Sequence, residues 1–193
     1  MSRHGMVMRS TLSMQRDIID HHYTHSLPSG ACWYFDVLGV VVVFSIPANR
    51  NIARFLGCTE VWELSRLWAA DGHGRNLLTQ ALKQAISAFR LIIPGADALV
   101  SYADPNVGHE GYVYRAASWI YLGRSKETRA YVGRDGTVKP RRAFHSGSAA
   151  MTKAEIEATG WKQINLLGKH RYAKGLTKKA RRSISGIMQA EAA

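Results

Sequence analysis

One amphipathic helix set between strand-like segments constrains the fold more than any other feature. Between Arg75 and Arg90, apolar side chains recur at helical spacing and form a single stripe, and polar side chains lie opposite. The longest apolar run, Val37–Ile46, contains four consecutive valines and is about half as long as a membrane-spanning helix, which favours a buried strand. Such a helix covers a sheet, so we expect an α/β protein without a membrane span.

Further elements are expected on both sides of this helix. Leu38-Gly39 favours a hairpin or a bulge between two strands, and Arg134-Asp135-Gly136 favours a turn. The expected helices are Met14–His22 and Gly111–Ser118, and the expected strands are Cys32–Asp36, Val40–Ile46, Val61–Ala69, Leu99–Ala103, Trp119–Gly123 and Arg129–Lys139.

The third of these strands alternates, which predicts two different faces. The faces are Val61, Glu63, Ser65 and Leu67 on one side and Trp62, Leu64, Arg66 and Trp68 on the other.

Charge is spread unevenly along the 193 residues. Residues 124–193 carry sixteen Lys and Arg against five Asp and Glu, which is nearly all of the net charge of +12. A strip of one sign attracts a polyanion, so we expect nucleic acid as the partner; a solvated tail or contact with acidic lipids is the alternative. The chain has no internal repeat and is expected to form one domain, with a core at about 31–145 and a basic C-terminal segment at about 146–193. The basic residues expected to bind DNA are Lys169, Arg171, Lys174, Lys178, Lys179, Arg181 and Arg182.

The cysteines and the N-terminal residues point to the cytoplasm. Cys32 and Cys58 lack metal-binding spacing and fit buried thiols in a reducing compartment. Residues 1–10 lack the apolar stretch of a secretory signal.

Residues 101–123 gather polar groups, aromatic rings and glycines in one short run that begins at the end of a strand. Open α/β sheets bind ligands just beyond such strand ends, so this run predicts a site. The alternative is an ordinary loop and helix whose polar residues face water. The side chains expected around the crevice are Ser101, Asp104, His109, Tyr112 and Tyr114.

A glycine-rich loop leads directly into the long helix. Gly72, Gly74, Arg75 and Asn76 can present backbone N–H groups and the positive end of the helix dipole to an anion. This predicts a phosphate-bearing donor; the alternatives are an ordinary glycine N-cap and a loop that binds DNA phosphate.

The histidines of residues 21–25 suggest a second kind of site. His22 beside Tyr23, together with a carboxylate such as Asp104, would suit iron or another transition metal. Neighbouring surface histidines without a metal are the alternative.

Several ordered motifs carry a family resemblance. SYAD, GHEG, VYRA and WIYLG follow one another within residues 101–123, after HHYTH, VVVFSIPANRN and ELSRLW and before KHRY. In this order they resemble the Mom family of Mu-like phages, whose members modify adenine in phage DNA to block restriction. The order of expected elements is similar to the GNAT acyltransferase fold. In GNAT enzymes a loop Q/R-x-x-G-x-G/A holds the pyrophosphate of coenzyme A; Gly72 and Gly74 match it, and Ala69 stands at its first position.

The resemblance implies a GNAT-like fold, a mixed and mostly antiparallel sheet flanked by helices, with a basic C-terminal segment. It implies an enzyme that converts adenine to N6-carbamoylmethyl adenine in double-stranded DNA inside the host cell. The donor would be acetyl-CoA or a related acyl-CoA-like, phosphate-bearing molecule. His22 and Tyr23 become functional residues on this basis.

Adenine N6 is a poor nucleophile, so an enzyme must orient it, accept its proton and present an electrophile. Asp104 or His109 can accept the proton, Tyr114 can donate to the oxygen of the transferred group, and Arg66 can hold a carbonyl or phosphate. The base must also be flipped out of the duplex. The stacking candidates are Tyr112, Trp119 and Tyr121, and the phosphate contacts nearest the site are Lys169, Arg171 and Tyr172.

Two other functions stay open from the sequence. One is a plain N-acetyltransferase acting on a small amine or a protein, and the other is a non-catalytic DNA-binding protein.

Overall fold

A six-stranded sheet forms the centre of the protein in the computed structural model, which describes residues 10–146 and 148–191. Its strands are β1 (Cys32–Val37), β2 (Val40–Ser45), β3 (Val61–Trp68), β4 (Ala98–Ala103), β5 (Ile120–Arg124) and β11 (His170–Gly175). They lie in the order β1-β2-β3-β4-β11-β5, and of the neighbouring pairs only β3 and β4 are parallel. The predicted mixed, mostly antiparallel sheet is therefore confirmed. Residues 1–9, on which the expectation about a secretory signal rests, lie outside the described residues.

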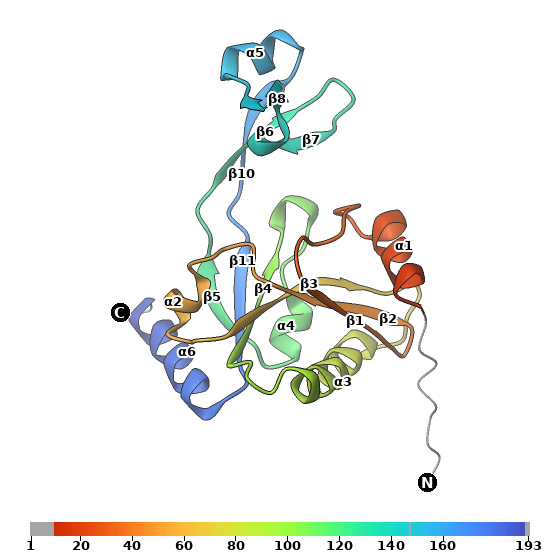
Figure 1. Ribbon diagram of the computed structural model, residues 1–193, viewed down its shortest axis with the longest axis vertical. Coiled ribbons are helices and arrows are strands. Elements are labelled where there is room, and N and C mark those ends of the chain that lie inside the picture. Colours follow the sequence, from red (N-terminus) through yellow and green to blue (C-terminus); the bar gives the residue numbers. More distant parts are fainter. Residues whose placement is uncertain (1–9, 147, 192–193) are drawn as a thin grey trace.

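Helices cover both faces of this sheet (Figure 1). Helices α3 (Leu77–Ile92) and α4 (Tyr112–Ala116) pack on one face, and α1 (Thr11–His21), α2 (Ile52–Leu56) and α6 (Lys178–Glu191) pack on the other. Successive valines of β2 alternate between the two layers, since Val40 and Val42 face α3 while Val41 and Val43 face α1. A strand that is buried on both sides needs a continuous apolar run, so the prediction for this segment is confirmed. None of the helices within the described ranges is both long and apolar enough to cross a bilayer.

Strand β3 contains a β-bulge that changes the predicted faces. Val43 pairs with Arg66, but the next residue of β2, Phe44, pairs with Leu64, so Ser65 is the extra residue. The predicted alternation is right up to Leu64 and wrong beyond it, because one added residue inverts the side chains that follow. Leu67 packs toward α3, Trp68 packs beneath α1, and Arg66 shares its face with Glu63.

A small unit stands away from the core on two connecting strands (Figure 1). We call residues 126–168 the arm. Its three-stranded sheet has the order β10-β6-β7, and Tyr131, Phe144 and Ile156 form its buried centre with Met151 and Trp161 packed against them. The elements of the arm are β6 (Thr128–Val132), β7 (Val138–Pro140), the 3-10 helix η2 (Arg141–Ala143), β8 (His145–Ser146), β9 (Ala149–Ala150), α5 (Lys153–Ala158) and β10 (Lys162–Leu166).

The C-terminal third does not form a separate segment. The predicted division near residue 145 passes through the arm, and β11 lies in the central sheet between β4 and β5. Sequence reasoning grouped residues 146–193 by their charge, and charge does not show which strands pair. It also missed α2 and the 3-10 helix η1 (Pro105–Val107).

Candidate functional site

A fork between the two parallel strands creates the first cavity. Pairing of β3 with β4 ends at Glu63 and Val100, although both strands continue beyond these residues. The cavity in this fork has a volume of about 270 Å³ and is lined by the bulged part of β3, the end of β4 and the loop and helix that follow. We call it the fork cavity. Bulges are common beside active sites, and ligands bind beyond strand ends in α/β sheets, so both features favour a site here.

A second cavity lies beside the fork cavity, at the foot of the arm. Its volume is about 500 Å³, and its walls come from β3, β4, β11 and the residues that connect the arm to the core. We call it the arm cavity. The two cavities share Tyr23, Leu64, Ser65, Arg66 and Tyr102 as lining residues, so a molecule in one lies next to a molecule in the other.

Five of the predicted catalytic side chains line the fork cavity. The Tyr23 ring lies between two histidines, with ring centroids 4.5 Å from His22 and 4.8 Å from His109. These residues come from the end of α1 and from the loop after β4, and the fold brings them together with β3. The five are His22, Tyr23, Arg66, His109 and Tyr114.

His22 is held in its neutral form. Burial, together with the charges of Arg66 and His109, lowers the pKa of His22 from 6.5 to about 4. The backbone N–H of Thr24 donates to its Nδ1 at 3.2 Å, and the Thr24 hydroxyl lies 2.8 Å from the same atom. Because Nδ1 accepts, the ring proton of neutral His22 is on Nε2. The imidazole can therefore donate one hydrogen bond from Nε2 to a ligand.

Arg66 is fixed at the boundary of the two cavities. Its Nε donates to the backbone oxygen of Ser26 at 2.9 Å, and its Nη1 donates to the backbone oxygen of Ser65 at 2.7 Å. Burial lowers the pKa of its guanidinium. A guanidinium held in this way presents a pre-oriented donor to a carbonyl or phosphate oxygen.

Ser101 and Tyr114 form a buried hydrogen-bonded pair beneath the cavity. The Ser101 hydroxyl donates to the backbone oxygen of Leu64 at 2.8 Å, and the side chain of Tyr114 is hydrogen-bonded to Ser101. Burial raises the pKa of Tyr114 to about 12, so its phenol stays protonated. Since the Ser101 hydroxyl is bonded to the β3 backbone and Tyr114 is bonded to Ser101, these residues position the separated ends of β3 and β4.

Asp104 lies under Lys169 and not in either cavity. Its Oδ2 is 2.9 Å from Lys169 Nζ, and its Oδ1 accepts hydrogen bonds from the backbone and side chain of Asn106. Burial alone would raise the pKa of Asp104, but Lys169 and Asn106 outweigh it and hold the pKa below its usual value. A carboxylate with a lowered pKa is a weak base, so this arrangement favours a role in placing Lys169 at the arm cavity.

Glu63 is a candidate that sequence reasoning missed. It lines the arm cavity, and its Oε2 accepts a hydrogen bond from the backbone N–H of Ala48 at 3.1 Å. Burial raises the pKa of Glu63, and the Ala48 N–H and the charges of Arg66 and Lys169 offset this only in part. A carboxyl group with a raised pKa beside a cavity is suited to proton transfer. The available signal was an acidic residue between Trp62 and Leu64 in a strand with buried neighbours.

The glycine-rich loop precedes α3 as predicted. Gly72 has a φ of 78°, Asn76 at the helix N-cap makes no side-chain capping hydrogen bond, and the first turn of α3 holds no acidic residue. Added side-chain atoms at Gly72 or Gly74 would meet only open space. With Arg75 beside an uncapped helix N-terminus, the loop fits a phosphate group.

The basic residues of the C-terminal third lie at different places. Tyr172 is 2% exposed and donates its hydroxyl proton to the backbone oxygen of Glu110 at 2.7 Å, so its predicted contact with DNA phosphate is wrong. Arg171 donates to the backbone oxygen of Leu122, and the half-buried Lys174 donates to that of Ala117. The exposed residues at the start of α6 are Lys178, Lys179, Arg181 and Arg182.

The predicted metal ligands are not arranged as a metal site. Nδ1 of His22 accepts from Thr24, and the carboxylate of Asp104 is bound by Lys169 and Asn106. Across residues 10–146 and 148–191, no group of three or more His, Cys, Asp and Glu side chains is placed to hold an ion. These residues do not fit iron in this arrangement.

Comparisons with known proteins show which family the chain matches and which proteins it is similar to. The model of the Mom protein family matches residues 10–191. A stretch of 66 residues is 33% identical to the methylcarbamoylase mom of Escherichia phage Mu, and the match spans 34% of this chain and 27% of that relative's length. Among solved structures, an acetyltransferase of Bacillus subtilis in complex with CoA is similar over 84% of each chain, with 13% identity and a TM-score of 0.42.

Proposed function

The chain belongs to the Mom protein family, and on this basis we propose that it modifies adenine in phage DNA and so protects that DNA from restriction. The reaction proposed is conversion of adenine to N6-carbamoylmethyl adenine in double-stranded DNA; the name of the Mu relative, methylcarbamoylase, refers to an isomeric group. The protein would act in the host cytoplasm. The observation that carries the proposal is the pair of adjoining cavities that meet at Tyr23 and Arg66.

Two substrates that must react need two adjoining places. We assign the fork cavity to the reactive end of the donor, because the start of α3 contributes Leu78 to its wall and the glycine-rich loop lies just before that helix. The loop can hold the phosphate end of acetyl-CoA or a related acyl-CoA-like donor through Gly72, Gly74, Arg75 and Asn76. When bound, a donor of this class would supply the electrophilic carbon, and for the carbamoylmethyl product the transferred group must already carry its amide nitrogen, because acetyl-CoA itself would transfer only an acetyl group.

The arm cavity then receives the flipped adenine. It is nearly twice as large as the fork cavity and is reached from the side on which the arm stands. Tyr23 and Tyr102, which belong to both walls, offer aromatic surfaces for a base. Lys126 and Lys169 line the same cavity and can neutralise the phosphates beside an extruded nucleotide.

Proton transfer follows from the groups at the boundary. As the N6–carbon bond forms, the carboxylate of Glu63 accepts the N6 proton, and the leaving group of the donor departs with the bonding electrons. Arg66 and Nε2–H of His22 donate hydrogen bonds to an oxygen of the transferred group. His109 is a second base within the fork cavity. Ser101 and Tyr114 hold the fork open, and Asp104 holds Lys169.

Restriction digestion tests the proposal in cells. Plasmid DNA from cells that produce the protein should resist endonucleases whose recognition sites contain adenine, and DNA from cells that produce Arg66→Ala should be cleaved. Full cleavage of the first DNA, together with acetyl transfer to a small amine in the absence of DNA, would instead favour a plain N-acetyltransferase.

A further inference from the structure

The arm carries exposed basic side chains that the proposed chemistry does not use, and they lie on both faces of its sheet, since Lys162 pairs with Val132 while Arg129 points to the opposite face. The side chains of Arg129, Arg134, Arg142 and Lys162 are exposed and make no hydrogen bond or ion pair within the described part of the chain. By contrast, most carboxylates of the arm have local partners. Asp135 accepts from Thr137, Glu155 caps α5 at Thr152, and Glu157 pairs with Lys153 at 3.7 Å. The electrostatic potential around the arm is therefore positive, and its basic side chains are available to bind a polyanion.

The foot of the arm forms one wall of the arm cavity. Ser125, Lys126, Thr128, Leu167 and Lys169 all line it. The foot is held against the loop after β4, because Asn106 donates to the backbone oxygen of Leu167 at 3.1 Å and accepts from the Leu167 N–H at 3.0 Å. A duplex that delivers a base to this cavity must pass beside the arm.

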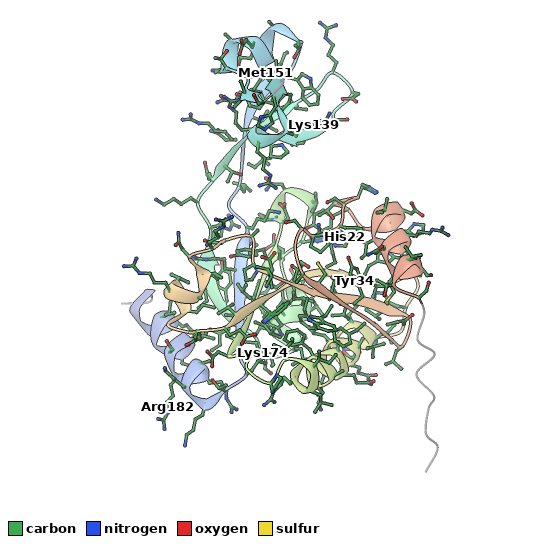
Figure 2. The ribbon with its side chains drawn as sticks, in the orientation of Figure 1. His22, Tyr34, Lys139, Met151, Lys174 and Arg182 are labelled. Atoms are coloured by element: carbon green, nitrogen blue, oxygen red, sulfur yellow. The ribbon has the colours of Figure 1, made fainter. Side chains whose placement is uncertain are left out.

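The other exposed basic group, at the start of α6, lies at the opposite end of the core. The backbone N–H groups of Leu176 and Thr177 donate to the backbone oxygen of Asp97, just before β4 begins. The cavities lie beyond the other end of β4, roughly 20 Å away at the usual rise of a strand. Figure 2 shows the same separation, with Lys139 of the arm at one end of the molecule and Arg182 of α6 at the other.

We propose that the arm is the part of the protein that grips the DNA duplex, through phosphate contacts from Arg129, Arg134, Arg142 and Lys162, while α6 is not a main contact. This inference rests on the proposed function for its partner and names the surface that binds it. Flipping a base costs a few kcal/mol, so the duplex must be held firmly beside the cavity, and phosphate contacts supply that without reading sequence.

Salt dependence of binding measures these contacts directly. Each phosphate contact that is lost lowers the slope of log K against log salt by about 0.9 for duplex DNA. The arm variant is Arg129→Gln, Arg134→Gln, Arg142→Gln and Lys162→Gln, and its control is Lys178→Gln, Lys179→Gln, Arg181→Gln and Arg182→Gln. Both variants lose four positive charges, so a difference between them cannot arise from net charge. Circular dichroism confirms that each variant is folded.

Binding of a 20-base-pair duplex is followed by fluorescence anisotropy at several salt concentrations. The arm variant should lose at least about 2 units of slope and the α6 variant less than about 1. An equal or larger loss in the α6 variant would overturn the inference, and so would an unchanged slope in the arm variant.

Removal of the arm gives an independent test. The Ser125 N–H donates to the Lys169 backbone oxygen at 2.8 Å, and the Lys169 N–H donates to the Ser125 hydroxyl at 2.9 Å, so a two-residue turn can replace residues 126–168. The core alone should bind the same duplex at least about tenfold more weakly than the full chain while it keeps its thermal transition. Undiminished binding by the folded core would refute the inference.

The proposed function is tested separately, by measuring modified adenine in cellular DNA. Modified adenine together with an arm variant of unchanged slope overturns the inference alone. Absence of modified adenine together with a reduced slope supports the arm as a DNA surface and overturns only the proposed chemistry.

Discussion

At the scale of single residues, burial moves the pKa values of His22 and Glu63 in opposite directions, and in both groups it favours the uncharged form. It lowers the pKa of His22, which keeps the imidazole neutral, and it raises the pKa of Glu63, which brings the carboxyl group closer to the range of a working base. Both shifts have desolvation as their largest cause. The degree of burial thus suits neutral His22 to donate a hydrogen bond and Glu63 to accept a proton at the boundary of the cavities.

Glu63→Gln should abolish proton acceptance without unfolding the protein. The rate of adenine modification should fall by about 10²–10⁴-fold, the usual contribution of a general base. Mass spectrometry of nucleosides from a timed reaction measures this, with the exposed arm residue Glu127→Gln as the control. Equal rates for Glu63→Gln and the wild type would remove Glu63 from the mechanism.

The same variant should change how stability depends on pH. The folded protein holds the Glu63 proton to a higher pH than the unfolded chain does, so the free energy of unfolding falls as pH rises through the window between the usual pKa and the raised one. Glu63→Gln lacks this loss and should be relatively more stable above that window. Urea unfolding between pH 4 and 8 tests it, and parallel pH profiles for the two proteins would contradict the raised pKa.

His22 should titrate near pH 4, with its proton on Nε2 above that pH. Long-range ¹H–¹⁵N NMR distinguishes the two ring nitrogens and follows the titration. Because the unfolded chain takes up this proton at higher pH than the folded one, His22 should also cost the protein stability as pH falls from 6.5 toward 4. A midpoint near 6.5, or a proton on Nδ1, would contradict the hydrogen bonding described above.

Sequence reasoning predicted cavity-lining residues whose chemistry is visible in their type and did not predict Glu63, whose raised pKa depends on burial. His22, Tyr23, Arg66, His109 and Tyr114 were predicted, and the fold brings them to one cavity. Glu63 was assigned only to a strand face, because the depth of a carboxyl group and its distance from Lys169 depend on tertiary packing. For the same reason, Lys169 as the partner of Asp104 could not be foreseen across 65 residues of chain.

At the scale of elements, the site depends on strands that separate and on a loop that passes close to β11. Gly111 begins α4 with a φ of 73°, and a side-chain carbon there would overlap the ring of Tyr172. Gly108 has a similar φ of 77° but open space around it. Substitution of Gly108 would therefore introduce backbone strain alone, whereas substitution of Gly111 would introduce backbone strain and steric overlap.

Gly108→Ala should cost about 1–2 kcal/mol of stability through its left-handed backbone. Gly111→Ala should cost about 1–3 kcal/mol more, because the added methyl group must displace the buried Tyr172 ring. Chemical denaturation of both variants measures the difference. Equal losses would show that the ring of Tyr172 does not constrain this loop.

Elements were predictable from the sequence where the residue types of a short turn determine its backbone conformation. The hairpin at Leu38-Gly39 was expected, and both residues have positive φ values, 56° and 78°. The bulge at Ser65 and the insertion of β11 between β4 and β5 were not expected, because neither changes the residue pattern of its own strand. Pairing between strands that are far apart in sequence is decided by the whole core.

At the scale of the whole molecule, the protein divides its positive charge between two ends that the sequence joins into one strip. The arm holds one exposed group and α6 holds another at the opposite end of the molecule (Figure 2), while Lys169, Arg171 and Lys174 lie at or next to β11 between them. The sequence correctly predicts a basic C-terminal third, but the fold alone determines which basic residues lie near the cavities.

The arm should open more easily than the core. Its buried centre consists of three residues with two more packed against them, whereas the layer between the sheet and α3 holds many large side chains. Hydrogen exchange should therefore be faster for amides of β6 and β10 than for those of β2 and β4. Equal protection in the two sheets would show that arm and core unfold as one unit.

Nucleoside mass spectrometry of DNA from producing cells tests the central claim most directly, namely that adenine is modified at the boundary of the two cavities. Wild-type protein should yield N6-carbamoylmethyl deoxyadenosine, and Glu63→Gln and Arg66→Ala should yield little or none. Unmodified deoxyadenosine with the wild type, or undiminished product with both variants, would contradict the account.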